Sequence, residues 1–370
     1  MKENLLKNEE YGRFLQLHIL TPYAPSNLNR DDLGKPKSAI FGGTNRLRIS
    51  SQCLKRTWRT SEVFTTELSG SIGFRTRNLQ TLIIDELKNF GISDEDELNQ
   101  ISDEWINKIY AGNKEVKEKP KKKNIETGEE TPYETNKIEI IHISPVEIEN
   151  IKKLIHEGKL PKDVKQSEIL YQSQENTAVD IALFGRMLAK STDYNIESAT
   201  QISHAITTHM VTGETDYFTA VDDLNNFNTG SAHLGEFEFG SGLFYHYICI
   251  NRELLIQNLN GNIELANKSI QALLEAIITT SPHGKQNSFA ALSRAAYVLA
   301  ETGNKTPRSL SMAFFNAVST QDLLKGSVDA LIECRNNIDK IYGQTWSKSQ
   351  ELNVMKLSGS LSELKKFVAE

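Results

Sequence analysis

Apolar residues recur along this chain with two different spacings, which separate predicted strands from predicted helices. Residues 13–20 alternate apolar and polar positions, and residues 242–250 are rich in apolar and aromatic side chains. Both patterns predict strands, and the first strand is expected to end at Pro22 and Pro25. Further strands are expected at 179–187, 201–209 and 295–300.

Apolar residues three and four apart predict helices between these strands. Residues 79–90 form one apolar stripe, and Ser93 opens a second helix over 98–109. A capping box at 144–147 begins a third helix. Other helices are expected at 252–259, 263–280, 310–319, 327–342 and 361–369. Because the strands are scattered between helices, the pattern predicts an α+β fold.

Two long segments lack either spacing. Residues 114–137 hold almost no large apolar side chain, which predicts a solvated insertion, although its three consecutive lysines are also compatible with nucleic-acid contact. Residues 211–240 contain an aromatic pair and several glycines. A connection of that length is typical of a functional loop or an extended hairpin.

Positive charge is concentrated in one part of the chain. The net charge of the whole sequence is −6, yet residues 30–59 hold eight basic residues against two aspartates, which is a local charge of +6. The remainder must then carry −12. A concentrated basic field of this kind indicates an anionic partner.

The order of residues in this basic segment favours phosphate binding. Arg46 to Ile49 alternate as in a half-buried strand, and Ser50 or Ser51 then caps a helix. A helix N-terminus offers unpaired N–H groups to a phosphate, and Gln52, Lys55 and Arg59 can add side-chain donors. Gly42 and Gly43 permit close approach of the preceding loop. The alternative interpretation is a solvated basic helix.

Composition narrows the class of protein. Of the 370 residues, 38% are hydrophobic, enough for a sizeable core. No apolar run approaches the ~20 residues of a membrane span, and the N-terminus does not resemble a secretory signal. Cys53, Cys249 and Cys334 are far apart in the sequence and form no metal-binding pair. We therefore expect a cytoplasmic protein without a metal or other cofactor.

Two metal-site hypotheses remain weaker alternatives. Asp31 and Asp32 beside the basic segment could hold Mg²⁺ in an RNase; otherwise one of them pairs with Arg30 or caps a turn. His204, His209 and His233 suggest zinc, but residues five apart on one strand point to opposite faces.

The aromatic residues Phe244, Tyr245 and Tyr247 follow a glycine on a predicted strand. This order partly matches an RNA-stacking sheet motif. The basic residue that should precede the glycine is absent, so core packing is the favoured role.

Three blocks of the sequence carry a family resemblance. They read HILTPYAPSNLNRDDLGKPKSAIFGGTNRLRISSQCLKRTWR, ISHAITTHMVTGETDYFTAVDDLNNFNTGSAHLG and FGSGLFYHYICINRELLIQNL. These blocks resemble the CasC backbone subunits of type I-E CRISPR Cascade complexes. The resemblance implies an RRM-like (ferredoxin-like) palm, a helical fingers insertion and an extended thumb loop or hairpin. Its expected boundaries are 1–60, 185–210 and 241–370 for the palm, 61–184 for the fingers and 211–240 for the thumb.

The resemblance also implies a function without catalysis. Such subunits polymerise head to tail along a CRISPR RNA and present it for base pairing with target DNA, alongside subunits of the CasA, CasB, CasD and CasE type. Expected RNA contacts are Lys37, Arg46, Arg48, Ser50, Gln52, Lys55, Arg59, Met187, Tyr217, Phe218 and Thr219. Tyr217 stands where the family has tryptophan, which departs from the familiar pattern. Cleavage of bound RNA through Asp31 and Asp32 is the alternative function.

Overall fold

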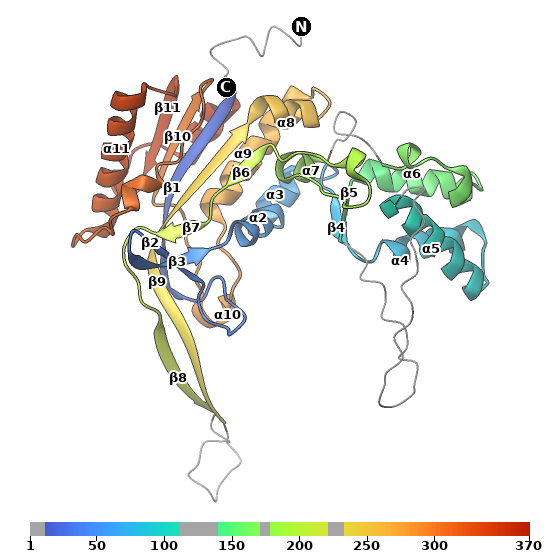
Figure 1. Ribbon diagram of the computed structural model, residues 1–370, viewed down its shortest axis with the longest axis horizontal. Helices are drawn as coiled ribbons and strands as arrows, with labels where there is room; N and C mark the ends of the chain where they lie inside the picture. Colours follow the sequence, from blue (N-terminus) through green and yellow to red (C-terminus); the bar gives the residue numbers. More distant parts are fainter. Residues whose placement is uncertain (1–11, 112–139, 171–177, 221–232) are drawn as a thin grey trace, which may run out of the picture. The chain divides into compact units, whose positions relative to one another are not determined.

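The computed structural model describes residues 12–111, 140–170, 178–220 and 233–370 (Figure 1). The chain divides into two compact units. The sheet unit comprises Met1–Glu67, Thr200–Glu253 and Asn267–Glu370. The helical unit comprises Leu68–Ala199 and Leu254–Ala266. The lysine-rich segment 114–137 lies outside the described residues.

One antiparallel sheet organises the first unit. Its strands run in the order β11-β10-β1-β9-β7-β3-β2, and β6 and β8 also pair with β9. Their bounds are β1 Phe14–Ser26, β2 Ser38–Phe41, β3 Thr44–Ile49, β6 Thr200–Ile202, β7 Ala205–Thr207, β8 Glu214–Ala220, β9 His233–Asn251, β10 Tyr297–Gly303 and β11 Lys348–Asn353.

The connections between the central strands identify the fold. The chain runs from β1 through α2 (Ser51–Arg59) to β6 and β7, then β9, α9 (Ile263–Thr279) and β10. In the sheet these strands take the order β10-β1-β9-β6/β7, with every pair antiparallel. This is the split βαβ arrangement of ferredoxin-like folds. The predicted α+β, RRM-like architecture is therefore confirmed.

Burial explains why the central strands are stable. Leu15, Leu17 and Ile19 of β1 are fully buried, and so are Gln16 and His18 on its other face. Leu20, Tyr245 and Tyr297 contribute to a cluster with η4 (Ser311–Phe314) and α11 (Leu323–Tyr342). Phe244 and Tyr245 are buried as well, which confirms core packing as their role.

The first strand is longer than predicted. β1 continues through Pro22 and Pro25 to Ser26, paired with β9. Its pairing with β10 ends at Leu20. The prolines therefore lie where β1 has a single neighbouring strand, and an edge position tolerates a missing N–H donor.

The strand predicted at 179–187 is wrong, because Val179–Phe184 forms helix α7. Its first five residues are all buried, Asp180 among them, so the apolar positions follow neither the helix nor the strand period. The strand predicted at 201–209 is two short strands, β6 and β7, with Ser203 and His204 between them.

Helices α8 Arg252–Asn258 and α12 Leu361–Ala369 lie where the sequence predicts. Helices α3 Glu62–Glu67 and α10 Gln286–Phe289 are not predicted as separate helices. The helix predicted at 310–319 is reduced to the short η4. No helix in the described ranges is long and apolar enough to cross a membrane.

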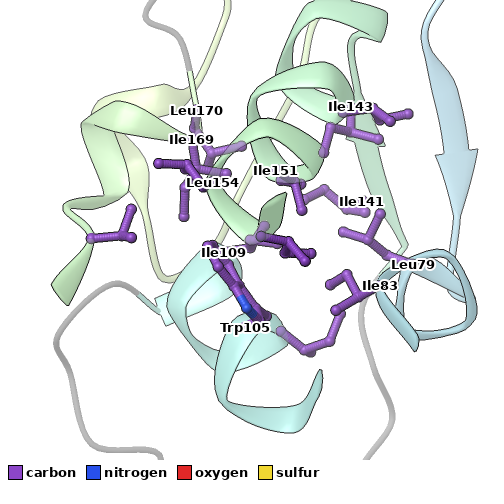
Figure 2. Close-up of a cluster of buried hydrophobic side chains, with 14 of the residues drawn as sticks. Leu79, Ile83, Trp105, Ile109, Ile141, Ile143, Ile151, Leu154, Ile169 and Leu170 are labelled. Atoms are coloured by element: carbon purple, nitrogen blue, oxygen red, sulfur yellow. The ribbon is translucent and has the colours of Figure 1, made fainter. Parts of the chain in front are cut away.

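The helical unit is built around Trp105, which is fully buried (Figure 2). Ile83, Ile109, Ile151 and Leu154 belong to the same cluster. Its elements are β4 Phe74–Thr76, α4 Leu79–Phe90, α5 Glu95–Ala111, β5 Ile141–Ile143, α6 Pro145–His156, η1 Pro161–Asp163, η2 Gln166–Glu168, α7 and η3 Thr192–Tyr194.

Capping residues begin two of these helices. The capping box predicted before α6 is confirmed, since Ser144 and Glu147 each bond the other's backbone N–H. The capping residue of α5 lies one position later than predicted, because Asp94 and not Ser93 accepts the hydrogen bond from Glu97 N, at 2.9 Å.

Candidate nucleic-acid interface

The junction between β3 and α2 has the predicted form of a strand running into a helix N-terminus. Ser50 caps α2 by accepting a hydrogen bond from Cys53 N at 3.3 Å. Its own N–H donates to Asn29 Oδ1 at 2.9 Å. The Ser50 side chain is buried, and its hydroxyl stabilises the helix start. Contact of this residue with a phosphate stays a prediction.

Exposed and half-buried donors follow along one side of α2. Gln52 is exposed, while Lys55 and Arg59 are half-buried. Partial burial lowers the pKa of Lys55. Because these three residues are spaced i, i+3 and i+7, they share a helix face. We name this face, together with Lys37 and Arg48, the basic face.

Lys37 and Arg48 are held beside this helix by the backbone. Lys37 N donates to Asn29 O, and Lys37 O accepts from Arg48 N, both at 2.8 Å. Arg48 Nη1 lies 3.0 Å from His204 Nδ1. Burial is the largest cause that lowers the pKa of His204, and the positive charges of Arg48 and Lys37 lower it further. The neutral imidazole can then accept a hydrogen bond from Arg48 and orient it.

Arg46 corrects the sequence prediction. Its side chain is fully buried. Nε donates to Thr44 Oγ1 at 2.9 Å, Nη1 to Thr207 O at 2.9 Å and Nη2 to Phe314 O at 3.0 Å. Arg46 therefore joins β3 to β7 and η4 inside the sheet unit, and it has no access to a phosphate.

The segment 27–37, which we call the cradle loop, is closed by an aspartate. Asp31 Oδ1 accepts hydrogen bonds from Leu33 N and Lys35 N, both at 2.9 Å. Asp31 therefore caps a turn, one of its two expected structural roles. Within the described ranges, no three histidine, cysteine, aspartate or glutamate residues are placed together to hold a metal ion.

Gly42 and Gly43 form the two-residue turn between β2 and β3, with φ angles of 59° and 77°. Both angles fall in the region that favours glycine. A Cβ at Gly42 would lie 1.5 Å from Phe315 O. The close approach that the glycines permit is thus made to the protein's own backbone.

The predicted thumb is a β-hairpin that extends beyond the main sheet (Figure 1). Strand β8 pairs with the first seven residues of β9. At its base, Asn27 Nδ2 donates to Glu238 O at 2.8 Å, and Lys35 forms an ion pair with Glu238. The cradle loop therefore anchors the hairpin. Residues 221–232 lie outside the described residues.

Tyr217 and Phe218 point to opposite faces of this hairpin, because successive strand residues alternate. Phe218 pairs with Gly235, and its ring centroid lies 5.6 Å from that of Phe237. Phe237 in turn contacts Phe289 of α10. Phe218 thus belongs to an aromatic row along one face of the hairpin.

The other face carries Tyr217 and Thr219. Tyr217 is 70% exposed, and the neighbouring Leu234 is 61% exposed. Tyr217 pairs with Glu236 and Thr219 with Leu234, which places all four side chains on this face. The predicted trio of residues 217–219 is therefore divided between two surfaces.

Met187 lies in the helical unit and is 81% exposed. The residues beside it are fixed. Arg186 Nη1 lies 2.8 Å from both carboxylate oxygens of Glu147, and Leu188 N donates to Asn195 Oδ1 at 2.6 Å. Both Arg186 and Leu188 are buried. A rigid support therefore presents one flexible apolar side chain to solvent.

Sequence reasoning missed two residues that position the basic face. Asn29 holds both Ser50 and Lys37, and His204 contacts Arg48. For Asn29, the only signal in the neighbouring sequence that could have indicated this role is that an asparagine lies in a turn-rich segment. The argument against a zinc site assumed that His204 and His209 lie on one strand. In the structure they lie on either side of the short strand β7.

Comparison with curated proteins finds no match. Solved structures are similar over almost the whole chain. One, described as a CRISPR RNA-guided surveillance complex, pre-nicking, has a TM-score of 0.80 and 26% sequence identity, covering 96% of this chain and 99% of that chain. Another, described as a CRISPR RNA-guided surveillance complex, has a TM-score of 0.57 and 22% identity, covering 96% and 98%, and shows the fold alone.

A family model described as CT1975-like protein matches residues 15–367. That match includes the cradle loop, the basic face, the thumb hairpin and the whole helical unit. The chain therefore belongs to the CT1975-like protein family.

Proposed function

We propose that this protein is an RNA-binding backbone subunit of a CRISPR RNA-guided surveillance complex, of the CasC type found in type I-E Cascade. The observation that carries the proposal is the basic face on α2, β3 and the cradle loop, in a chain that is similar over 96% of its length to a chain of such a complex. The sequence blocks that resemble CasC include this face.

The basic face suits a subunit that must hold any guide sequence. Lys37, Gln52, Lys55 and Arg59 offer donors to phosphate oxygens, together with the N-terminal turn of α2. Phosphate contacts position a strand without reading its bases. Sequence recognition of target DNA then falls to base pairing with the guide.

The thumb and Met187 supply the apolar contacts of the proposed complex. In this proposal, Phe218, Tyr217 and Met187 each stack or wedge against bases or against a neighbouring copy. Head-to-tail contact between copies gives an open filament along the RNA. Its ends would bind subunits of the CasA, CasB, CasD and CasE type in the cytoplasm.

The double substitution Lys55→Ala and Arg59→Ala tests the basic face. Each lost phosphate contact lowers the salt slope of single-strand binding by roughly 0.7, so the slope of the double variant should be shallower than that of the natural protein by about 1.4. The measurement is fluorescence anisotropy of a labelled RNA across a salt series. The matched control is Lys365→Ala, whose lysine pairs with Glu275 away from α2. An unchanged slope in the double variant would place the RNA elsewhere.

We also propose that the subunit holds RNA without cutting it. Asp31 is engaged in a turn, and its Asn variant keeps the oxygen that accepts the Leu33 and Lys35 hydrogen bonds. Asp31→Asn with Asp32→Asn should therefore leave RNA binding unchanged, and labelled RNA incubated with Mg²⁺ should stay intact with either protein. Mg²⁺-dependent cleavage by the natural protein that the double variant loses would establish the RNase alternative.

A further inference from the structure

A pocket of about 450 Å³ opens beside α2, next to the basic face. Its lining includes Leu28, Arg30, Cys53, Arg56, Thr57 and His283. Cys53, Thr57 and Thr60 lie on a different side of the helix from Gln52, Lys55 and Arg59, because successive residues turn by about 100°. The pocket and the basic face therefore share one helix but open in different directions.

The charge of the pocket favours an anion. Arg30 and Arg56 are exposed, and neither guanidinium has a hydrogen bond or ion pair with another residue in the described ranges of the chain. The acidic residue of the lining is Asp31, whose Oδ1 already accepts two backbone hydrogen bonds. The pocket is thus lined by two arginines whose guanidinium groups are available to a ligand. Its one carboxylate, that of Asp31, already accepts two hydrogen bonds from the backbone of its own turn.

The walls of the pocket are formed before any ligand binds. A Cβ at Gly284 would lie 2.2 Å from Leu28 O, so glycine at this position lets the loop after α9 pack directly on the cradle loop. Asn29 is tied to Ser50 and Lys37, and Thr57 is buried. Contacts from three separate elements fix the shape of the pocket, which lowers the entropy cost of binding.

We propose that this pocket is a second phosphate-binding site, which holds a phosphodiester of a nucleic-acid strand beside the basic face. Arginine forks match the oxygen geometry of a phosphate, and the hydroxyl of Thr57 adds a neutral donor, whereas the hydroxyl of Thr60 already donates to Arg56 O at 2.8 Å. The volume is within the range of pockets that hold a nucleotide-sized ligand. The identity of the strand rests on the proposed function, whereas the affinity for phosphate does not.

Cys53 provides a direct reporter of occupancy. It is the half-buried cysteine of the three, while Cys249 and Cys334 are buried and serve as internal controls. Alkylation of Cys53 in the full chain is followed by mass spectrometry with single-stranded RNA, with the same RNA annealed to complementary DNA, or with inorganic phosphate. A strand at ten times its Kd leaves about one pocket in eleven free, so labelling should slow roughly tenfold.

Matched variants separate the pocket from the basic face. Arg56→Gln should abolish protection of Cys53 and lower the salt slope by roughly 0.7, while RNA stays bound to the basic face. Arg59→Gln should lower the slope by the same amount and keep the protection. If RNA protects Cys53 equally well in Arg56→Gln, the shielding comes from the basic face and the proposal is overturned.

The three probes also distinguish the source of the phosphate. Protection by single-stranded RNA assigns the pocket to the guide strand, and protection that needs the annealed DNA assigns it to the second strand; either result supports the site. If the natural protein binds no RNA, the proposed function fails, and protection by inorganic phosphate that Arg56→Gln loses still supports the pocket. No protection by any of the three probes overturns it.

Discussion

Replacement of Arg186 by methionine is expected to destabilise the helical unit by about 3–5 kcal/mol. The Arg186 and Glu147 side chains are 1% and 0% exposed, and Nη1 of the arginine lies 2.8 Å from the glutamate oxygens. Removing the cation leaves a buried carboxylate without its counter-charge, and desolvation of that carboxylate is costly.

Hydrogen exchange of the α6 amides measures this loss, because it reports the opening free energy of the helical unit separately from the sheet unit. Arg77→Met is the matched control, since Arg77 is exposed in the same unit. Adding Glu147→Gln to Arg186→Met should restore part of the stability, because the amide oxygen can still cap Ser144 N and no charge is buried. A double variant as unstable as Arg186→Met alone would contradict this account.

Replacement of Arg46 by methionine should destabilise the sheet unit and leave the salt dependence of RNA binding unchanged. The variant leaves the carbonyl oxygens of Thr207 and Phe314 without this donor, and each unsatisfied buried acceptor costs about 1–3 kcal/mol. Urea unfolding followed by exchange of the β3 and β7 amides measures the stability. RNA titrations on the folded protein measure the slope.

Arg48→Met is the matched control on the same strand. Arg48 is half-buried beside His204, so its loss should change the free energy of unfolding by less than about 0.5 kcal/mol, as for most surface substitutions. It should lower the salt slope by roughly 0.7 if Arg48 contacts a phosphate. The reverse outcome, with Arg46 controlling the slope and Arg48 the stability, would mean that the two arginines are misassigned.

Local signals predicted those elements whose stability depends on their own residues. The capping box before α6, the apolar stripe of α4 and the serine cap of α2 all involve groups within four positions of one another. Such interactions are visible in the order of residues. Elements whose side chains are buried all round, such as α7, carry no visible period, and the short edge strand β11 is stabilised by pairing with β10, which is distant in the sequence.

The sequence by itself determined the concentration of basic residues around α2, the helix start that presents them and the long hairpin connection, because these properties depend on residue order alone. Only the tertiary structure decided which of those residues are available to a ligand. Arg46 is buried because Phe314, 268 residues further along the chain, accepts its hydrogen bond. Arg186, beside the exposed Met187, is fixed by Glu147, which lies 39 residues earlier in the chain. Burial and pairing of this kind arise from long-range contacts, which the pattern of neighbouring residues does not encode.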